Sequence, residues 1–270
     1  MIHEKNFRDV TNFLRNISDE ASQRILEVYN SKITFKIKDD HSPVTIADTE
    51  SNEIICQKIK KEFKSIPIIS EENKKKTIKS ETYFLVDPLD GTKEFIQRNG
   101  EFTVNIALIV NNRPKLGVIQ LPAHNLQYFS DGFHSFKYNG ALKKIFSFTS
   151  SKKLRLLISR SHLDVDTKKV IKKFENTKFQ KVGSSLKFCY LAEGRADIYI
   201  RNGKTMAWDV AAGIAILKTA GGDIKTLDLK EFILDKTNFI NSPFICFRKD
   251  FPQEKIKSIS KQYNKTTKNE

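Results

Sequence analysis

The stretch Phe84–Phe95, FLVDPLDGTKEF, begins as the apolar run of a buried strand and ends in two aspartates, Asp87 and Asp90, that flank a proline and a leucine. Asp at the first position and Pro at the second favour a type I turn, in which the first and fourth Cα atoms lie within about 7 Å. Both carboxylates can then face one point, where they repel each other unless a cation lies between them. Mg²⁺ prefers carboxylate, carbonyl and water oxygens, so this turn predicts a candidate magnesium site. An ordinary turn, in which Asp87 caps the turn and Asp90 begins a helix, is the alternative.

Other polar residues lie at equivalent places, at the ends of apolar elements. Glu71 follows the predicted strand PIIS, Asp209 opens a predicted helix, and Asp48 lies near the start of another. Backbone amides that open a helix can hold a phosphate oxygen, and Gly91 and Thr92 provide such amides. If Asp48 accepts a hydrogen bond from the Thr92 hydroxyl, the pair can orient and deprotonate an attacking water. Taken singly, each acid is also explained as an exposed acid or as a first-turn acid favoured by the helix dipole.

Composition sets the class of protein. The 270 residues are 39% apolar, including 20 Phe, which is enough for one large core or two closely packed lobes. The formal net charge of +15 indicates either anionic partners or a lysine-rich solvated surface. The three widely spaced cysteines include no CxxC pair and fit a reduced compartment. Without an apolar segment long enough to span a bilayer, we expect a cytoplasmic protein; peripheral contact with the anionic cytoplasmic face of the inner membrane stays open.

Apolar periodicity divides the chain into two lobes and a tail. We expect an α+β lobe over residues 1–145, with an amphipathic helix over about 4–29 and an antiparallel meander over about 102–130. Strands and helices alternate over residues 146–262, which predicts an α/β lobe. Residues 263–270 are expected to be a frayed tail.

Four blocks of sequence carry a family resemblance. SPVTIAD, PIISEE, VDPLDGTKEF and WDVAAGIAILKTAGG, in this order, resemble the Mg²⁺-dependent, lithium-sensitive phosphatase superfamily that includes the inositol monophosphatases. DGTKEFIQRNGEFTVNIALI and GSSLKFCYLAEGRADIY are more similar to the bacterial 3'(2'),5'-bisphosphate nucleotidases of the CysQ type. The resemblance spans about residues 18–225 and implies a layered αβαβα sandwich. One departure is Lys204, where proline is common.

The resemblance also implies a set of site residues. Asp48 and Thr92 would activate the attacking water, and two or three Mg²⁺ ions would be held by Glu71, Asp87, the Leu89 carbonyl, Asp90 and Asp209. Gly91 and Thr92 would hold the scissile phosphate, which also lies against Glu71, Leu89, Asp90 and Asp209.

A bisphosphate substrate needs a second anion site. Arg160, His162 and Lys187 are candidate contacts to the far phosphate, and Gly183, Ser184 and Ser185 open a helix that can meet ribose, base or phosphate. The alternative for Arg160 and Lys187 is a solvated surface charge.

The implied reaction removes the 3'-phosphate of adenosine 3',5'-bisphosphate to give AMP. We therefore expect a small nucleotide as partner and no nucleic acid, while the oligomeric state stays open. Two alternatives remain: a phosphatase of the same fold acting on inositol or other polyol phosphates, and a non-catalytic basic protein that binds nucleic acid or lipid.

Overall fold

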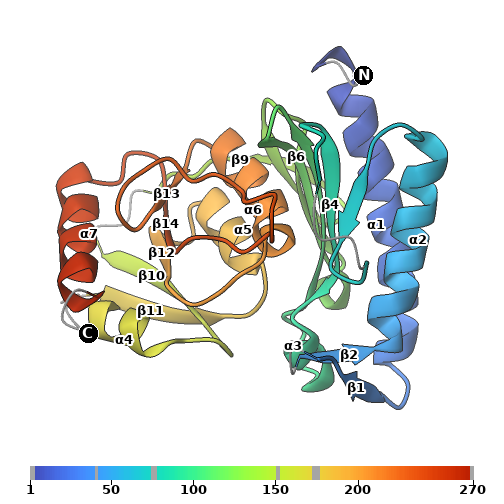
Figure 1. Cartoon of the computed structure of the whole chain (residues 1–270), viewed down its shortest axis with the longest axis horizontal. Coiled ribbons are helices and arrows are strands. Elements are labelled where there is room, and N and C mark those ends of the chain that lie inside the picture. The colour runs from blue at the N-terminus through green and yellow to red at the C-terminus, as the bar shows by residue number, and fades with distance from the viewer. Residues whose placement is uncertain (1–3, 40–41, 74–77, 150–152, 172–176, 268–270) are drawn as a thin grey trace.

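Five alternating layers of helices and strands make up the chain (Figure 1). The computed structural model describes residues 4–39, 42–73, 78–149, 153–171 and 177–267. The layers follow the order helices, sheet, helices, sheet, helices, so the predicted αβαβα sandwich is confirmed. Every helix of the described ranges is too short or too polar to cross a bilayer.

The first sheet has seven strands in the order β3-β4-β5-β6-β7-β8-β9. β3 pairs parallel with β4, and the other neighbours pair antiparallel. The predicted meander is confirmed as β5 to β7, and the pattern did not predict the two strands that extend it. The strands are β3 (Ile68–Ser70), β4 (Tyr83–Asp90), β5 (Thr103–Val110), β6 (Arg113–Leu121), β7 (Leu126–Ser130), β8 (Ser135–Tyr138) and β9 (Leu142–Ile145).

Helices α1 (Phe7–Tyr29) and α2 (Ile46–Glu62) cover one face of this sheet (Figure 1). A 3₁₀ turn, η1 (Glu4–Asn6), precedes α1. The buried residues of α1 recur at three- and four-residue intervals, which confirms the amphipathic helix predicted for the first segment. The two-stranded antiparallel hairpin β1 (Phe35–Ile37) and β2 (Pro43–Thr45) leads into α2. A second 3₁₀ turn, η2 (Pro122–His124), joins β6 to β7.

The second sheet has five strands in the order β11-β10-β12-β14-β13. β10 pairs parallel with β11 and β12, whereas β14 pairs antiparallel with β12 and β13. The α/β alternation expected for this part of the chain is confirmed. The strands are β10 (Leu154–Ser159), β11 (Thr177–Val182), β12 (Ile198–Arg201), β13 (Asp223–Thr226) and β14 (Phe244–Phe247).

The middle layer consists of α5 (Leu186–Ala192) and α6 (Ala207–Thr219), which lie between the two sheets (Figure 1). Glycine allows α6 to approach β6 closely, because a Cβ at Gly117 would lie 2.4 Å from the Ala212 carbonyl oxygen. Apolar side chains of both sheets and both helices form one continuous core here.

The outer layer consists of α4 (Val165–Ile171) and α7 (Gln253–Thr267). The tail predicted for residues 263–270 is wrong as far as Thr267, because α7 continues to that residue; residues 268–270 lie outside the described ranges. Ile256, Ile259 and Tyr263 recur at helical spacing and pack on the second sheet, which explains why this polar segment is ordered as a helix.

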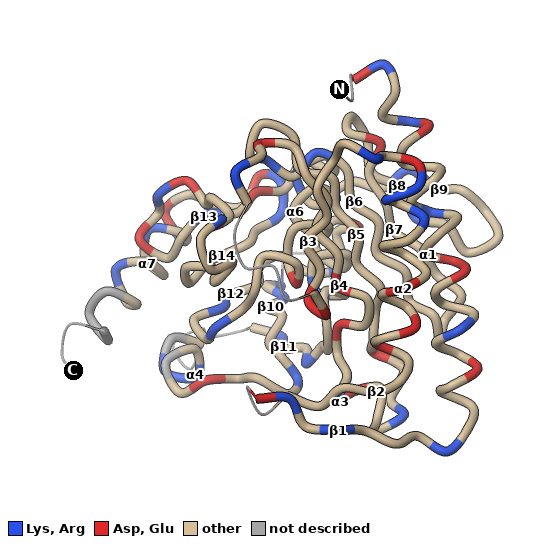
Figure 2. Tube along the Cα trace, turned by 45° about the vertical axis from the view of Figure 1, so that its right-hand side comes forward, with Lys and Arg blue, Asp and Glu red and all other residues tan. Residues whose placement is uncertain are grey.

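Positive charge is spread over the whole chain. Figure 2 shows Lys and Arg on every layer of the fold rather than on one face. The charge distribution therefore favours the solvated lysine-rich surface over a polyanion-binding face.

Candidate active site

The segment that carries Asp87 and Asp90 is a strand with a β-bulge. The type I turn predicted for it is wrong, because the segment continues β4 to Asp90. Asp87 pairs with Asn105 and Asp90 with Thr103, so three steps along β4 oppose two steps along β5. One extra residue in a strand is a bulge, and the proline within it has no N–H to donate to the ladder.

The bulge places both aspartates on one face of the sheet. Side chains alternate along a strand, and Tyr83 and Leu85 face the middle layer of helices. Asp87 keeps that alternation, and the extra residue then turns Leu89 toward the core beneath α1 and α2. Asp90 consequently lies on the same side of the sheet as Asp87. Both carboxylates therefore face the same region, as predicted, although a bulge and not a turn brings them there.

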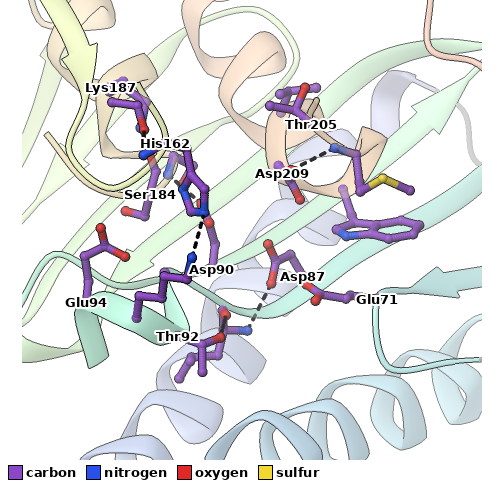
Figure 3. A pocket seen from close by; sticks show the side chains of 18 of the residues that line it. Glu71, Asp87, Asp90, Thr92, Glu94, His162, Ser184, Lys187, Thr205 and Asp209 are labelled. Atoms are coloured by element: carbon purple, nitrogen blue, oxygen red, sulfur yellow. Dashed lines mark hydrogen bonds between the residues drawn. The ribbon is translucent and has the colours of Figure 1, made fainter. Parts of the chain in front are cut away.

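Three acids from three elements meet at this face (Figure 3). Glu71 follows β3, whose parallel pairing with β4 continues through a hydrogen bond from the Glu71 amide to the Val86 carbonyl (3.1 Å). Asp209 lies in the first turn of α6, where its carboxylate accepts a hydrogen bond from the Met206 amide (2.8 Å). One carboxylate oxygen from each of Glu71, Asp87 and Asp209 lies within 4.8 Å of the others.

Burial and mutual repulsion make this cluster costly without a cation. Desolvation, followed by repulsion from Glu71 and Asp90, raises the pKa of Asp87 well above its usual value. Desolvation and the charges of Asp90 and Glu71 raise the pKa of Asp209 in the same way. An oxygen-only donor set of this kind, with Asp87 buried and Glu71 and Asp209 half-buried, fits a hard divalent cation, which would relieve the repulsion.

Lys38 interacts with one edge of the cluster. Its ammonium lies 2.9 Å from a Glu71 oxygen and also donates to Glu72. Burial disfavours the charged Lys38, but the two carboxylates outweigh it and raise its pKa. No local sequence pattern marks Lys38, because its partner Glu71 lies 33 positions further along the chain.

The predicted contact between Asp48 and Thr92 is present. The Thr92 hydroxyl donates to Asp48 Oδ1 (3.1 Å), and Asp48 Oδ2 accepts hydrogen bonds from the amide (2.7 Å) and hydroxyl (2.6 Å) of Thr45. These bonds fix the Asp48 carboxylate where α2 begins. Burial raises its pKa, opposed by the hydrogen bonds from Thr45 and Thr92. Thr92 is the first residue of α3 (Thr92–Ile96) and lines the cavity, so it connects the buried Asp48 carboxylate with the cavity.

Asp90 contacts the second lobe. Asp90 Oδ2 accepts a hydrogen bond from the Ser185 amide (2.6 Å) and a longer one from the Asn105 side chain (3.5 Å). Burial raises its pKa to about 6, although the nearby Lys187 charge lowers it. Asp90 and the Leu89 backbone line the same cavity as the three clustered acids, and their part in binding a metal stays a prediction.

A cavity of about 340 Å³ contains both ends of the site. Figure 3 shows Asp87, Glu71 and Asp209 on one side of it and Lys187, His162 and Ser184 on the other. Of the predicted residues, those that line the cavity are Glu71, Asp87, Leu89, Asp90, Gly91, Thr92, His162, Ser184, Ser185, Lys187 and Asp209. Lys204, the departure from the family pattern, lies there as well.

The basic side of the cavity is unusual for its buried lysine. Burial lowers the pKa of Lys187 to about 8, and the Asp90 carboxylate opposes that effect. Its ammonium donates to the Ser184 carbonyl and, at 3.3 Å, to that of Val182. His162 lies 3.4 Å from the Lys93 ammonium, and desolvation and that charge lower its pKa. Lys187 is therefore buried in the wall of the cavity, and the surface-charge alternative for it is wrong; its contact with a substrate stays a prediction.

Three predicted residues do not line the cavity. Arg160 forms a bidentate ion pair with Glu101, so its guanidinium faces a carboxylate of the protein rather than the cavity. The Gly183 amide donates to the same carboxylate (2.6 Å). Asp48 also lies behind the cavity wall and reaches it through Thr92.

Three further charged residues of the cavity were not predicted: Lys93, which contacts His162, and the buried Arg201 and Glu94. Arg201 is almost fully buried at the end of β12 and donates to the carbonyls of His162, Gly203 and Lys204. Glu94 is buried in α3 and accepts a hydrogen bond from Ser161. Arg201 carries the signal used for the acids, a polar residue at a strand end, and could have been found by it; Glu94 carries no comparable signal.

The fold and the acidic cluster define a class of protein: the chain belongs to the inositol monophosphatase family, whose model matches residues 6–265. Two similar relatives are both called 3'(2'),5'-bisphosphate nucleotidase CysQ. The one from Buchnera aphidicola is 41% identical over 263 residues, covering 88% of this chain and 97% of the relative. The one from Escherichia coli K12 is 38% identical over 213 residues, covering 77% and 87%.

Solved structures agree with this placement. CysQ from Bacteroides thetaiotaomicron, described as a bacterial member of the inositol monophosphatase family, is 33% identical with a TM-score of 0.79, over 90% of this chain and 98% of that one. An IMPase from Thermotoga maritima is 25% identical with a TM-score of 0.80, over 97% and 99%.

Proposed function

We propose that this protein is a Mg²⁺-dependent phosphomonoesterase that removes the 3'-phosphate of adenosine 3',5'-bisphosphate to give AMP and phosphate. One observation carries the proposal: a single cavity has clustered carboxylates on one side and Lys187, His162 and Arg201 on the other. A substrate with one reacting phosphate and one distant phosphate matches those two sides. The CysQ relatives, which carry the name of this activity, support the same choice.

The acidic side would hold the metal through Glu71, Asp87 and Asp209, with Asp90 and the Leu89 carbonyl beside them. When bound, Mg²⁺ would supply Lewis-acid polarisation of the phosphoryl group and offset the negative charge that develops during displacement. The number of ions, two or three, stays a prediction.

Asp48 and Thr92 would activate the attacking water. Because the Thr92 hydroxyl donates its own hydrogen to Asp48, its oxygen is left to accept a hydrogen bond from water. As the water oxygen attacks phosphorus, its proton passes to Thr92 while the Thr92 proton passes to Asp48. The bond between phosphorus and the ribose oxygen breaks, and its electron pair stays on that oxygen, which takes up a proton from solvent water to give the 3'-hydroxyl of AMP; no covalent enzyme intermediate forms. The amides of Gly91 and Thr92 would orient the phosphate oxygens.

The remaining walls of the cavity suit a nucleoside. Trp208, Met206, Phe188 and Tyr199 contribute apolar surface, on which a base can pack. Lys187 and His162 would meet the second phosphate, and Ser184 lies beside them. This division assigns chemistry to the acidic side and specificity to the basic side.

A polyol phosphatase is the second candidate, because the Thermotoga maritima IMPase shares the fold over nearly the whole chain. Phosphate release should therefore be measured from adenosine 3',5'-bisphosphate, adenosine 3'-monophosphate and inositol 1-phosphate, each with Mg²⁺ and with EDTA. We expect fast, Mg²⁺-dependent release from the bisphosphate and much slower release from the other two. Equal turnover of both nucleotides would contradict the second anion site. A preference for inositol 1-phosphate would show that the substrate is a polyol phosphate instead of the nucleotide.

Asp87→Asn should abolish turnover of every substrate, because it removes a charged carboxylate from the centre of the cluster. Asp228→Asn changes an acid that is paired with Lys230 away from the cavity, and it is the matched control.

A further inference from the structure

Glu101 joins the two lobes beside the cavity. It lies between α3 and β5 in the first lobe, and its carboxylate accepts hydrogen bonds from two residues of the second lobe, Arg160 and Gly183. Arg160 Nε and a terminal guanidinium nitrogen donate at 2.7 and 2.6 Å, and the Gly183 amide donates at 2.6 Å. Burial opposes the charged form, but these donors outweigh it and hold the pKa of Glu101 below its usual value. A carboxylate bound by three N–H groups is a rigid anchor.

The segment held by this anchor is the turn that opens α5. Ser184 has a φ of +44°, a conformation that L-residues other than glycine adopt only where the surroundings enforce it. The Gly183 amide on one side of it binds Glu101, and the Ser185 amide on the other binds Asp90. Two carboxylates of the first lobe therefore hold the residues that flank Ser184.

Close packing leaves the turn little freedom to move. A Cβ at Gly183 would lie 3.0 Å from both Cβ and the carbonyl oxygen of Glu101, and a Cβ at Gly91 would lie 3.4 Å from Ser184 Cβ. The Gly91 turn, which would hold the reacting phosphate, thus lies against Ser184. Lys187 is attached to the same turn through its hydrogen bond to the Ser184 carbonyl.

We propose that Glu101 is a positioning residue for the nucleotide: by clamping Arg160 and the Gly183 amide, it fixes the Ser184 turn and Lys187 at the distance from the Gly91 turn that a bisphosphate requires. This inference rests on the proposed function. It also gives Arg160 a new role, since its guanidinium supports the wall of the site instead of contacting the far phosphate.

A double-mutant cycle of Glu101→Gln and Arg160→Gln tests the clamp. We expect each change to raise the KM for adenosine 3',5'-bisphosphate about tenfold, the effect of losing one charge-assisted hydrogen bond. The double variant should be no worse than either single one, because both remove the same anchor. The kcat should change less than about threefold, and the dissociation constant of AMP should rise with KM. Glu231→Gln, which breaks the exposed ion pair with Arg113 away from the cavity, is the control and should change none of these values.

A direct contact between Arg160 and phosphate predicts a different pattern. Arg160→Gln would then raise KM, whereas Glu101→Gln would free the guanidinium and lower KM or leave it unchanged. That outcome, or additive effects in the double variant, overturns the clamp.

Hydrogen exchange provides a readout that needs no turnover. Exchange of the amides in residues 183–185 should be faster in Glu101→Gln than in the wild type and in Glu231→Gln. Unchanged exchange overturns the clamp. The two proposals can fail separately. If the wild type does not hydrolyse the bisphosphate while exchange is faster in Glu101→Gln, the proposed function and the nucleotide role of Glu101 are refuted, and the anchor itself is established.

Discussion

Replacing Lys38 with methionine should tighten Mg²⁺ binding about tenfold. The Lys38 ammonium lies 2.9 Å from a Glu71 oxygen, and Glu71 is one of the three clustered acids, so a metal ion bound by that carboxylate would compete with the ammonium. Two unit charges at this separation interact with about 1.4 kcal/mol in a dielectric as high as that of water, and 1.4 kcal/mol is a factor of about ten in an equilibrium constant. The pair is only partly exposed, so a water-like dielectric gives a conservative value.

Calorimetric titration of Mg²⁺ into the EDTA-treated, dialysed protein measures this change without substrate. Lys58→Met is the matched control, because Lys58 forms an ion pair with Glu20 (2.7 Å) away from the cavity, and its Mg²⁺ affinity should equal that of the wild type. Unchanged binding by the Lys38 variant would refute the competition argument. Weaker binding would also refute it, and would show that Lys38 holds Glu71 in place for the ion.

Three other perturbations give separate expectations. Thr92→Val should lower kcat by about 10² to 10⁴-fold, the usual contribution of a positioned proton acceptor, while Thr92→Ser keeps most activity; equal losses in steady-state assays would rule out the hydroxyl relay. In EDTA, the raised pKa values of Asp87 and Asp90 mean that the native state retains protons that the unfolded chain has lost. The free energy of unfolding should therefore fall as pH rises from about 4, where an unfolded aspartate titrates, through about 6, and Mg²⁺ should raise the Tm more at about pH 7.5 than at about pH 5. A Tm increment independent of pH would contradict that linkage. Gly213→Ala should destabilise the fold by about 2 kcal/mol in urea denaturation despite the better helix propensity of alanine, because its Cβ would lie 2.4 Å from Phe188 Cγ; a stabilised variant would show that the middle layer can relax.

Apolar periodicity predicted the elements of the fold better than their ends. The long amphipathic helix at the start, the meander and the alternation of the second lobe all follow from local patterns of buried residues. The hairpin β8–β9 was missed because β9 presents mostly exposed side chains and carries no alternating pattern. Helix α7 was missed because a single apolar stripe in a lysine-rich segment resembles a solvated tail.

The sequence predicted which acids cluster but not the geometry that brings them together. Acids at the ends of apolar elements identified Glu71, Asp87 and Asp209, since strand and helix ends converge at one edge of a layered fold. The two aspartates of β4 are joined by a bulge instead of the predicted turn. The bulge could not be predicted, because one extra residue in a ladder leaves no trace in the local sequence pattern. The charge pairing of Arg160 was also beyond the pattern, as its partner lies 59 residues away.

The shared middle layer has a consequence for how the chain unfolds. Residues of both sheets contribute to the same core around α5 and α6. Unfolding of either half would therefore expose the apolar face of the other half to water. The protein should therefore melt cooperatively as one unit, and proteolytic cleavage between β9 and β10 should yield two fragments that remain associated. Glu71 and Asp87 come from the first half of the chain and Asp209 from the second, so the candidate metal site needs both halves to be folded.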